Sequence, residues 1–169
     1  MAEEKKSTGI PILKRSFDIV SSFLVLLILS PFFILLGVAV WLDMGWPVFF
    51  SQDRPGYQGR LFKIFKFRSM RQPKPGEIGV EHDAARITRF GRFLRSTSLD
   101  ELPELWCILN GRMSVVGPRP LLKEYLPLYN DRQMRRHDLQ PGLTGWAQIN
   151  GRNTLSWEDK FELDLWYID

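Results

Sequence analysis

Two neighbouring carboxylates in Ser98–Glu101, which reads SLDE, are the first residues that could do chemistry. The pattern matches a capping box, in which Ser98 is the N-cap of a helix and Glu101 is its N3 partner. This structural interpretation accounts for both residues. A functional interpretation stands beside it: Asp100 would lie where free N–H groups and the helix dipole keep a carboxylate ionised, ready to act as a nucleophile or metal ligand. The same helix start would attract phosphate.

Two arginines in loops rich in proline and glycine are candidates for binding phosphate. Arg119 lies between Pro118 and Pro120, and the following proline pushes its backbone towards an extended conformation. A guanidinium on a stiff loop loses little entropy when it binds phosphate with both arms of its fork. Arg152, in the sequence NGRN, has the same two interpretations: a phosphate ligand, or a surface arginine in a turn.

Composition narrows the class of partner. The formal net charge of +4 favours polyanions, namely nucleic acid, an anionic lipid surface or phosphorylated small molecules. The sequence has no GxxxxGK[ST], GxGxxG or Asp-x-Asp motif, which disfavours the common nucleotide-binding folds. Cys107 is the only cysteine, so no internal disulfide forms. His82 and His137 lack zinc-site spacing and are expected in surface positions or loops, and Glu162 and Asp164 are expected on a solvated face.

An uncharged segment, Ile19–Leu42, is long enough to enter a bilayer. As a straight helix it would measure about 36 Å, against a hydrocarbon core of about 30 Å. Ser30 and Pro31 interrupt it at mid-depth, where proline removes a backbone N–H and the freed groups need a partner such as the Ser30 hydroxyl. One alternative is a kinked spanning helix. The other is a re-entrant helix that turns at Ser30–Pro31, which is favoured because basic residues flank both ends.

The elements that must position the candidate residues follow this segment. Val48–Phe50 and Leu61–Phe67 are rich in β formers and flank the turn sequence DRPGYQG, which predicts a hairpin. Arg86–Arg95 has helical spacing of arginines opposite apolar residues and predicts an amphipathic helix on the bilayer surface. A further helix should start in SLDELPELWCIL. The last helix has four apolar residues on one face: Trp157, Phe161, Leu165 and Ile168.

A series of motifs from Lys14 to the end of the chain resembles one family. The motifs are KRSFDIV, the Ser30–Pro31 break, FKIFKFRSM, LRSTSLDELPEL, GRMSVVGPRPLL, LQPGLTGWAQINGRN and FELDLWYID. Together they resemble the bacterial monotopic phosphoglycosyl transferases, which are polyprenyl-phosphate sugar-1-phosphate transferases, and are most similar to the small, minimal members. The resemblance also implies further helix after FELDLWYID, whereas this sequence ends at Asp169.

The resemblance implies a mostly helical α+β fold for a monotopic membrane protein. Its parts would be a disordered tail (1–10), a re-entrant membrane helix hairpin (11–43) and a catalytic domain (44–169) with amphipathic interfacial helices and a small β-hairpin or sheet. The protein would lie in one leaflet, at the cytoplasmic face of the bacterial inner membrane. Lys14, Arg15 and Asp18 match the entry of the re-entrant helix and are expected to be structural.

The implied reaction transfers a sugar 1-phosphate from a UDP-sugar to a polyprenol phosphate and releases UMP, as the first membrane step of glycoconjugate synthesis. By matching motif, Asp100 resembles the nucleophile that forms a phosphosugar-aspartyl intermediate, and it would also bind Mg²⁺. Glu101 resembles its acid/base partner. The resemblance implies phosphate and nucleotide contacts by five residues: Arg95, Pro118, Arg119, Pro120 and Arg152. It implies no nucleic-acid partner and leaves a homodimer open.

Two other functions remain alternatives at this point. One is a non-catalytic basic module on the membrane surface that binds anionic lipid or nucleic acid, which needs the arginine cluster and the apolar segment but no defined acids. The other is a glycosyltransferase that moves the sugar alone and releases UDP. Release of UMP from a UDP-sugar separates the implied reaction from both alternatives.

Overall fold

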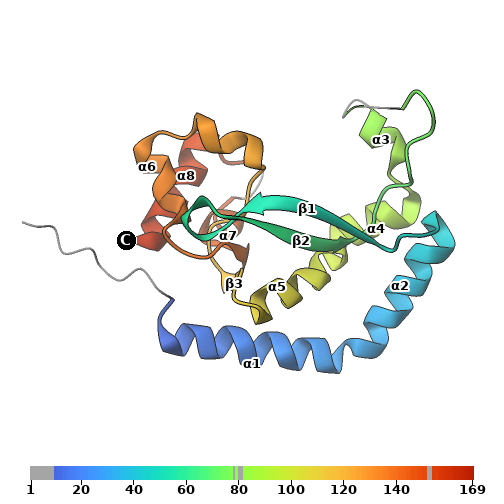
Figure 1. Cartoon of the computed structure of the whole chain (residues 1–169), viewed down its shortest axis with the longest axis horizontal. Helices are drawn as coiled ribbons and strands as arrows, with labels where there is room; N and C mark the ends of the chain where they lie inside the picture. The colour runs from blue at the N-terminus through green and yellow to red at the C-terminus, as the bar shows by residue number, and fades with distance from the viewer. Residues whose placement is uncertain (1–9, 78, 80–81, 152–153) are drawn as a thin grey trace, which may run out of the picture.

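The structure of the chain is a computed structural model that describes residues 10–77, 79, 82–151 and 154–169. The expected disordered tail therefore lies outside the described residues except for Ile10. Figure 1 shows the long first helix, α1 (Ile12–Ile28), along one edge of the molecule and the second, α2 (Ser30–Met44), turning away from its end. The hairpin of β1 (Phe49–Pro55) and β2 (Leu61–Phe67) crosses the molecule alongside them.

The α1–α2 junction is a sharp break at Leu29, where the two helices are bent by 64°. Ser30 Oγ donates a hydrogen bond of 2.8 Å to the carbonyl of Leu27. This is the carbonyl that a residue with an N–H at position 31 would bond, and Pro31 has none. The predicted interruption at Ser30–Pro31 is confirmed, with the serine hydroxyl as the substitute donor. Among the described residues no helix could cross a membrane alone, but the bent pair has the necessary length and composition.

The predicted hairpin is confirmed, although β1 runs through part of the expected turn as far as Pro55. Its strands are antiparallel, with Phe49 opposite Phe67 and Pro55 opposite Leu61, and the short 3₁₀ turn Tyr57–Gly59 joins them. Strand β2 contributes to two apolar clusters. Phe67 packs with α2 in the first cluster, and Ile64 packs with residues 105–113 in the second.

The predicted helix over Arg86–Arg95 is wrong at its start. Arg86 ends the single turn α3 (Asp83–Arg86), and Ile87 is extended. Helix α4 (Arg89–Thr97) begins three residues later because Thr88 is its N-cap, accepting a hydrogen bond of 2.9 Å from the N–H of Gly91. A 3₁₀ helix, η3 (Leu99–Glu104), and the short α5 (Leu105–Leu109) follow, where one helix start was predicted.

The remaining elements form the end of the molecule opposite α2 in Figure 1. Strands β3 (Ser114–Val116) and β4 (Gly142–Thr144) pair in parallel. The other elements are η4 (Lys123–Leu128), α6 (Asp131–Met134), η5 (Arg135–His137), α7 (Trp146–Ile149) and α8 (Trp157–Ile168). The last helix was predicted, and Ser156 caps it by accepting from the N–H of Asp159 at 3.0 Å. The fold is thus α+β and mostly helical, as expected.

Three charged side chains on α1 hold this helix against the backbone of residues 108–116: Lys14, Arg15 and Asp18. Arg15 donates to the carbonyls of Ile108 at 2.6 Å and Leu109 at 2.8 Å. Lys14 donates to Val116 O at 2.8 Å, and Asp18 accepts from the N–H of Val115 at 3.0 Å. The structural role expected for the three residues is that of a polar clamp between α1 and the β3 region.

Candidate functional site

The turn between α4 and η3 places the two carboxylates. Ser98 ends α4 in the left-handed conformation, with φ 57° and ψ 18°, and its side chain caps no N–H of η3. The predicted capping box is therefore wrong, because an N-cap needs an extended backbone and Ser98 is used as the C-cap of the preceding helix. Glu101 is left free to bind residues that are distant in the sequence.

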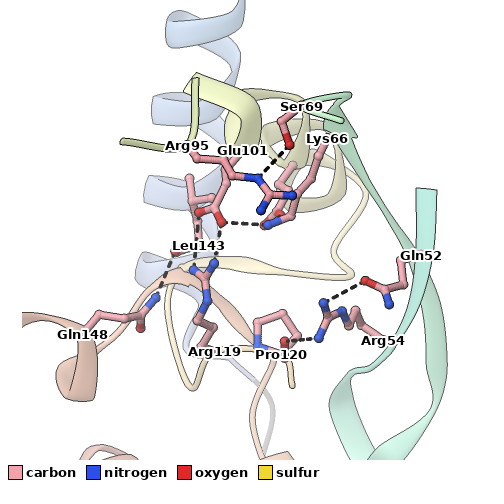
Figure 2. Close-up of polar contacts among 11 residues, drawn as sticks. Gln52, Arg54, Lys66, Ser69, Arg95, Glu101, Arg119, Pro120, Leu143 and Gln148 are labelled. Atoms are coloured by element: carbon pink, nitrogen blue, oxygen red, sulfur yellow. Dashed lines mark hydrogen bonds and ion pairs between the residues drawn. The ribbon is translucent and has the colours of Figure 1, made fainter. Parts of the chain in front are cut away.

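Glu101 lies between two cations (Figure 2). Its Oε1 accepts from Lys66 Nζ at 2.7 Å and also from Arg119 Nη2, and its Oε2 accepts from Arg119 Nη1 at 3.3 Å. Lys66 also lies 3.1 Å from a carboxylate oxygen of Glu104. Burial raises the pKa of Glu101, but the hydrogen bond and charge of Arg119, together with Lys66, outweigh it and lower the pKa to about 2. Glu101 is therefore firmly ionised in this arrangement.

Asp100 occupies a different environment from its neighbour. It is 8% exposed, and among the described residues it makes no ion pair within 4 Å. Burial raises its pKa, opposed by the charge of Lys66 and reinforced by the charge of Glu101. The expected stabilisation of its ionised form by a helix start is thus outweighed by burial. A poorly hydrated carboxylate with no ion-pair partner is available to bond an incoming group.

The loop that carries Arg119 is held on both flanks. The N–H of Gly117 bonds the carbonyl of Thr144, and the N–H of Gly142 bonds that of Pro118, each at 2.9 Å. A Cβ atom on Gly142 would lie 2.1 Å from the nitrogen of Gly117, so this approach requires glycine. Arg54 Nη1 reaches the carbonyl of Pro120 at 3.5 Å. The backbone from which the Arg119 side chain extends is consequently fixed.

A cavity of about 510 Å³ opens beside these residues, and we call it the basic pocket. Asp100 and Glu101 line it together with seven cationic side chains: Arg54, Lys66, Arg68, Arg71, Arg86, Arg95 and Arg119. Its volume is in the range of small-molecule sites. The cations suit a ligand that carries several negative charges, such as a diphosphate.

A second cavity of about 660 Å³ adjoins the Glu101–Arg119 pair, and both apolar and charged side chains line it. Side chains of α7 and α8, including Ala147, Ile149 and Phe161, line much of it. Ser98, Glu101 and Arg119 line both pockets. The Glu101–Arg119 ion pair therefore forms part of a wall that the two cavities share.

The structure brings together most of the residues predicted for the site. Arg95 lines the basic pocket and donates from Nε to Ser69 Oγ at 2.8 Å, and Pro118 and Pro120 flank Arg119 in the loop. Arg152 lies outside the described residues. Ser30 and Pro31 lie at the α1–α2 break and line neither pocket.

Sequence reasoning missed Lys66, Glu104 and the buried pair of Arg136 and Asp164. Asp164 was expected on a solvated face, but it is 4% exposed and lies 2.7 Å from Arg136 Nη2. The only local signal for Lys66 was a lysine within the largely apolar strand LFKIFKF. The ion-pair partners of these four residues are all more than 25 positions away in the sequence, where no local pattern connects them.

His137 was expected in a surface position or loop and is buried, at 5% exposed. Its Nδ1 lies 3.2 Å from the carbonyl of Gly56. Burial, followed by the charge of Arg136, lowers the pKa of His137 to about 4, against a small opposing effect of the Gly56 carbonyl. The imidazole is therefore neutral at pH 7 and packs as a core residue.

The sequence of the chain is similar to those of known bacterial proteins. Residues 10–169 match the family model described as bacterial sugar transferase. The chain is 50% identical to the uncharacterized sugar transferase EpsL of Bacillus subtilis, over 94% of this chain and 78% of EpsL. It is 38% identical to the exopolysaccharide production protein ExoY of Rhizobium meliloti, over 92% of this chain and 76% of ExoY.

A longer relative is the UDP-glucose:undecaprenyl-phosphate glucose-1-phosphate transferase of Escherichia coli, which is 42% identical over 93% of this chain. The match covers 36% of that protein, so the chain spans about a third of its length. The family model covers nearly the whole chain, and the matched residues 10–169 include the acids and the arginine loop of the basic pocket. The chain therefore belongs to the bacterial sugar transferase family, a family of transferase enzymes.

Proposed function

We propose that this protein transfers a sugar 1-phosphate from a UDP-sugar to a polyprenol phosphate and releases UMP. The observation that carries the proposal is the basic pocket, where Asp100 lies without an ion-pair partner among the described residues, next to Arg119 and Lys66. The names of relatives support it. The relative from Escherichia coli is a UDP-glucose:undecaprenyl-phosphate glucose-1-phosphate transferase, and that from Salmonella typhimurium is an undecaprenyl-phosphate galactose phosphotransferase.

The proposed chemistry proceeds in two displacements at phosphorus. An oxygen of Asp100 attacks the β-phosphorus of the UDP-sugar, the bond from that phosphorus to the bridging oxygen breaks, and UMP leaves with the electron pair. A phosphosugar-aspartyl intermediate remains. An oxygen of the polyprenol phosphate then attacks the same phosphorus and releases the Asp100 carboxylate.

Glu101 is the proposed acid/base partner, and its ion pairs determine when it can act. With its pKa lowered to about 2 it holds no proton while Arg119 and Lys66 bind it. Once these cations turn to substrate phosphates, Glu101 loses their stabilisation and its pKa rises. In the second displacement it can then take the proton from the acceptor phosphate, and it releases this proton to solvent when the two cations bind it again.

The proposed cofactor is Mg²⁺, bound near Asp100 by few protein ligands. Within the described residues no group of three or more His, Cys, Asp or Glu side chains could hold a metal ion. Mg²⁺ in nucleotide sites commonly uses one or two carboxylates and completes its shell with phosphate oxygens and water. Asp100 is the proposed protein ligand. The ion would offset charge on the diphosphate and on the oxygen that leaves.

The proposed site of action is the cytoplasmic face of the bacterial inner membrane, with α1 and α2 as a re-entrant hairpin in one leaflet. The bent pair has the required composition, and its outer side chains are exposed large apolar residues, including Phe23, Leu27, Leu35 and Leu42. Such a surface is unfavourable in water and suits lipid.

A direct test incubates the protein with Mg²⁺ and a panel of UDP-sugars, including UDP-glucose and UDP-galactose, without polyprenol phosphate. UMP release and a mass adduct of one phosphosugar on the peptide with Asp100 are expected. Asp100→Asn keeps the side-chain size, removes the anionic nucleophile and should abolish both results without loss of folding. Full turnover by Asp100→Asn, or an adduct on another residue, would overturn the covalent mechanism. Release of UDP would instead favour transfer of the sugar alone.

A further inference from the structure

A buried ion pair outside the basic pocket connects to the Arg119 loop. Arg136 in η5 is 3% exposed and Asp164 in α8 is 4% exposed. Arg136 donates to Asp164 Oδ2 from Nη2 at 2.7 Å and from Nε at 3.2 Å. The desolvation of two charges is expensive, and a well-packed apolar pair is often at least as stable. Stability alone is therefore a weak explanation for this pair.

The rest of the Arg136 guanidinium binds two further groups. Nη2 donates to the backbone carbonyl of Arg119 at 2.9 Å, and Nη1 donates to the hydroxyl of Tyr129 at 3.2 Å. The rings of Phe161 and Tyr129 lie 5.5 Å and 5.7 Å from its central carbon. Each nitrogen of Arg136 thus has a partner among the described residues. Arg136 is consequently a poor candidate for binding substrate directly.

These contacts form one path from α8 to the carboxylate of the site. Asp164 fixes Arg136, Arg136 fixes the carbonyl of Arg119, and the guanidinium of Arg119 binds Glu101. The neighbouring bonds of Gly117 and Gly142 hold the loop before Arg119, whereas Arg136 holds Arg119 itself. A small displacement of this carbonyl would move the guanidinium at the end of a long side chain.

We propose that Arg136, held by Asp164, is a positioning residue that fixes the backbone of Arg119 and so sets where its guanidinium meets the diphosphate of the donor. The proposal rests on the proposed function for its catalytic consequence. Arg136→Lys keeps the charge, but one ammonium group lacks the planar fork that reaches the carboxylate and the carbonyl together. UMP release in this variant should fall about 10- to 100-fold in kcat/KM, as expected for a misplaced charged group.

A double-mutant cycle identifies the path of the effect. If Arg136 acts through Arg119, then adding Arg136→Lys to Arg119→Lys should lower UMP release less than about 2-fold further. An equal loss in both backgrounds, with the proteins folded, would show that Arg136 acts independently and would overturn the proposal. Asp164→Asn removes the charged partner of Arg136 but keeps Arg136 itself, and it should lower UMP release as Arg136→Lys does. It provides the test if Arg136→Lys does not fold.

The matched control is the exposed ion pair between Arg132 in α6 and Glu162 in α8. It also links α8 to this part of the chain, but it does not contact Arg119. Arg132→Gln should leave UMP release within about 2-fold of the wild type, as is usual for exposed pairs. A loss as large as that of Arg136→Lys would mean that docking of α8, rather than placement of Arg119, is responsible.

An NMR measurement that needs no catalytic turnover tests the positioning of Arg119 independently of the proposed function. The Nε–Hε NMR signal of Arg119, assigned by its loss in Arg119→Lys, should shift in Arg136→Lys and stay in place in Arg132→Gln. If it does not shift in Arg136→Lys, the positioning role is wrong whatever the activity. If it shifts while the wild type releases no UMP from any UDP-sugar, the proposed function fails and the positioning of Arg119 stands.

Discussion

Asp100 and Glu101 are adjacent carboxylates whose surroundings move their pKa values in opposite directions. Burial raises the pKa of Asp100. For Glu101 burial acts in the same direction, but Arg119 and Lys66 overcome it and bring the pKa to about 2. Pairs of acids separated in this way are typical of sites where one group bonds the substrate and the other handles a proton.

His137 provides a test of burial at the scale of one residue. Its folded pKa of about 4 is below the ordinary 6.5, so between these values the unfolded chain binds a proton that the folded chain does not. The free energy of unfolding should therefore fall as the pH drops from 6.5 to 4, by up to about 3 kcal/mol. Denaturant titrations across this range should show the loss in the wild type and a smaller one in His137→Asn. Equal losses in the two proteins would contradict the assignment.

Four of the residues that line the basic pocket could be predicted because they lie in recognisable sequence motifs, namely Asp100, Glu101, Arg95 and Arg119. The ion pair of Arg136 and Asp164 could not, because the two residues are 28 positions apart and both types are usually exposed. A lone acid on a helix is more often solvated, and only the tertiary fold shows that Asp164 faces inward.

At the scale of elements, the turn from α4 into η3 decides how the acids are presented. The local pattern SLDE predicted a helix start, and the structure has instead a left-handed Ser98 followed by a 3₁₀ helix. The competing interaction is long-range, since Glu101 binds residues 18 and 35 positions away. The hairpin and α8 were predicted correctly because β-forming residues and the helical spacing of apolar residues are local signals.

The effect of Ser98 substitutions on stability shows whether this residue is the C-cap of α4 or the N-cap of a following helix. A left-handed residue other than glycine is strained by about 1–2 kcal/mol, so Ser98→Gly should stabilise the protein by about 1 kcal/mol. Ser98→Ala should change stability little, because the side chain caps no N–H of η3. Chemical denaturation in detergent would measure both. A loss of about 1 kcal/mol in Ser98→Ala would instead indicate that the serine is an N-cap.

At the scale of the whole molecule, the break at Ser30–Pro31 sets the direction of α2. Pro31→Ala restores the backbone N–H that can bond Leu27, which the Ser30 hydroxyl now binds, so a straighter helix becomes favourable. Single cysteines at Lys5 and Lys74 on a Cys107→Ser background can be labelled with an impermeant thiol reagent.

In the parent protein both cysteines should be labelled from the same side of the membrane. Pro31→Ala should shift part of the population to labels on opposite sides, because a straightened α1–α2 helix would be long enough to span. Labels on opposite sides in the parent itself would show that the re-entrant arrangement is wrong.

The polar clamp on α1 has a consequence for the biosynthesis of the chain. Lys14, Arg15 and Asp18 bind partners that lie 93 to 102 positions later. At a translation rate of about 5–20 residues per second, the ribosome needs roughly 5–20 s to make those partners after α1 has been made. During that interval the three charges of α1 have no partners in the β3 region. Helix α1 therefore reaches its final position only after most of the protein has been synthesised.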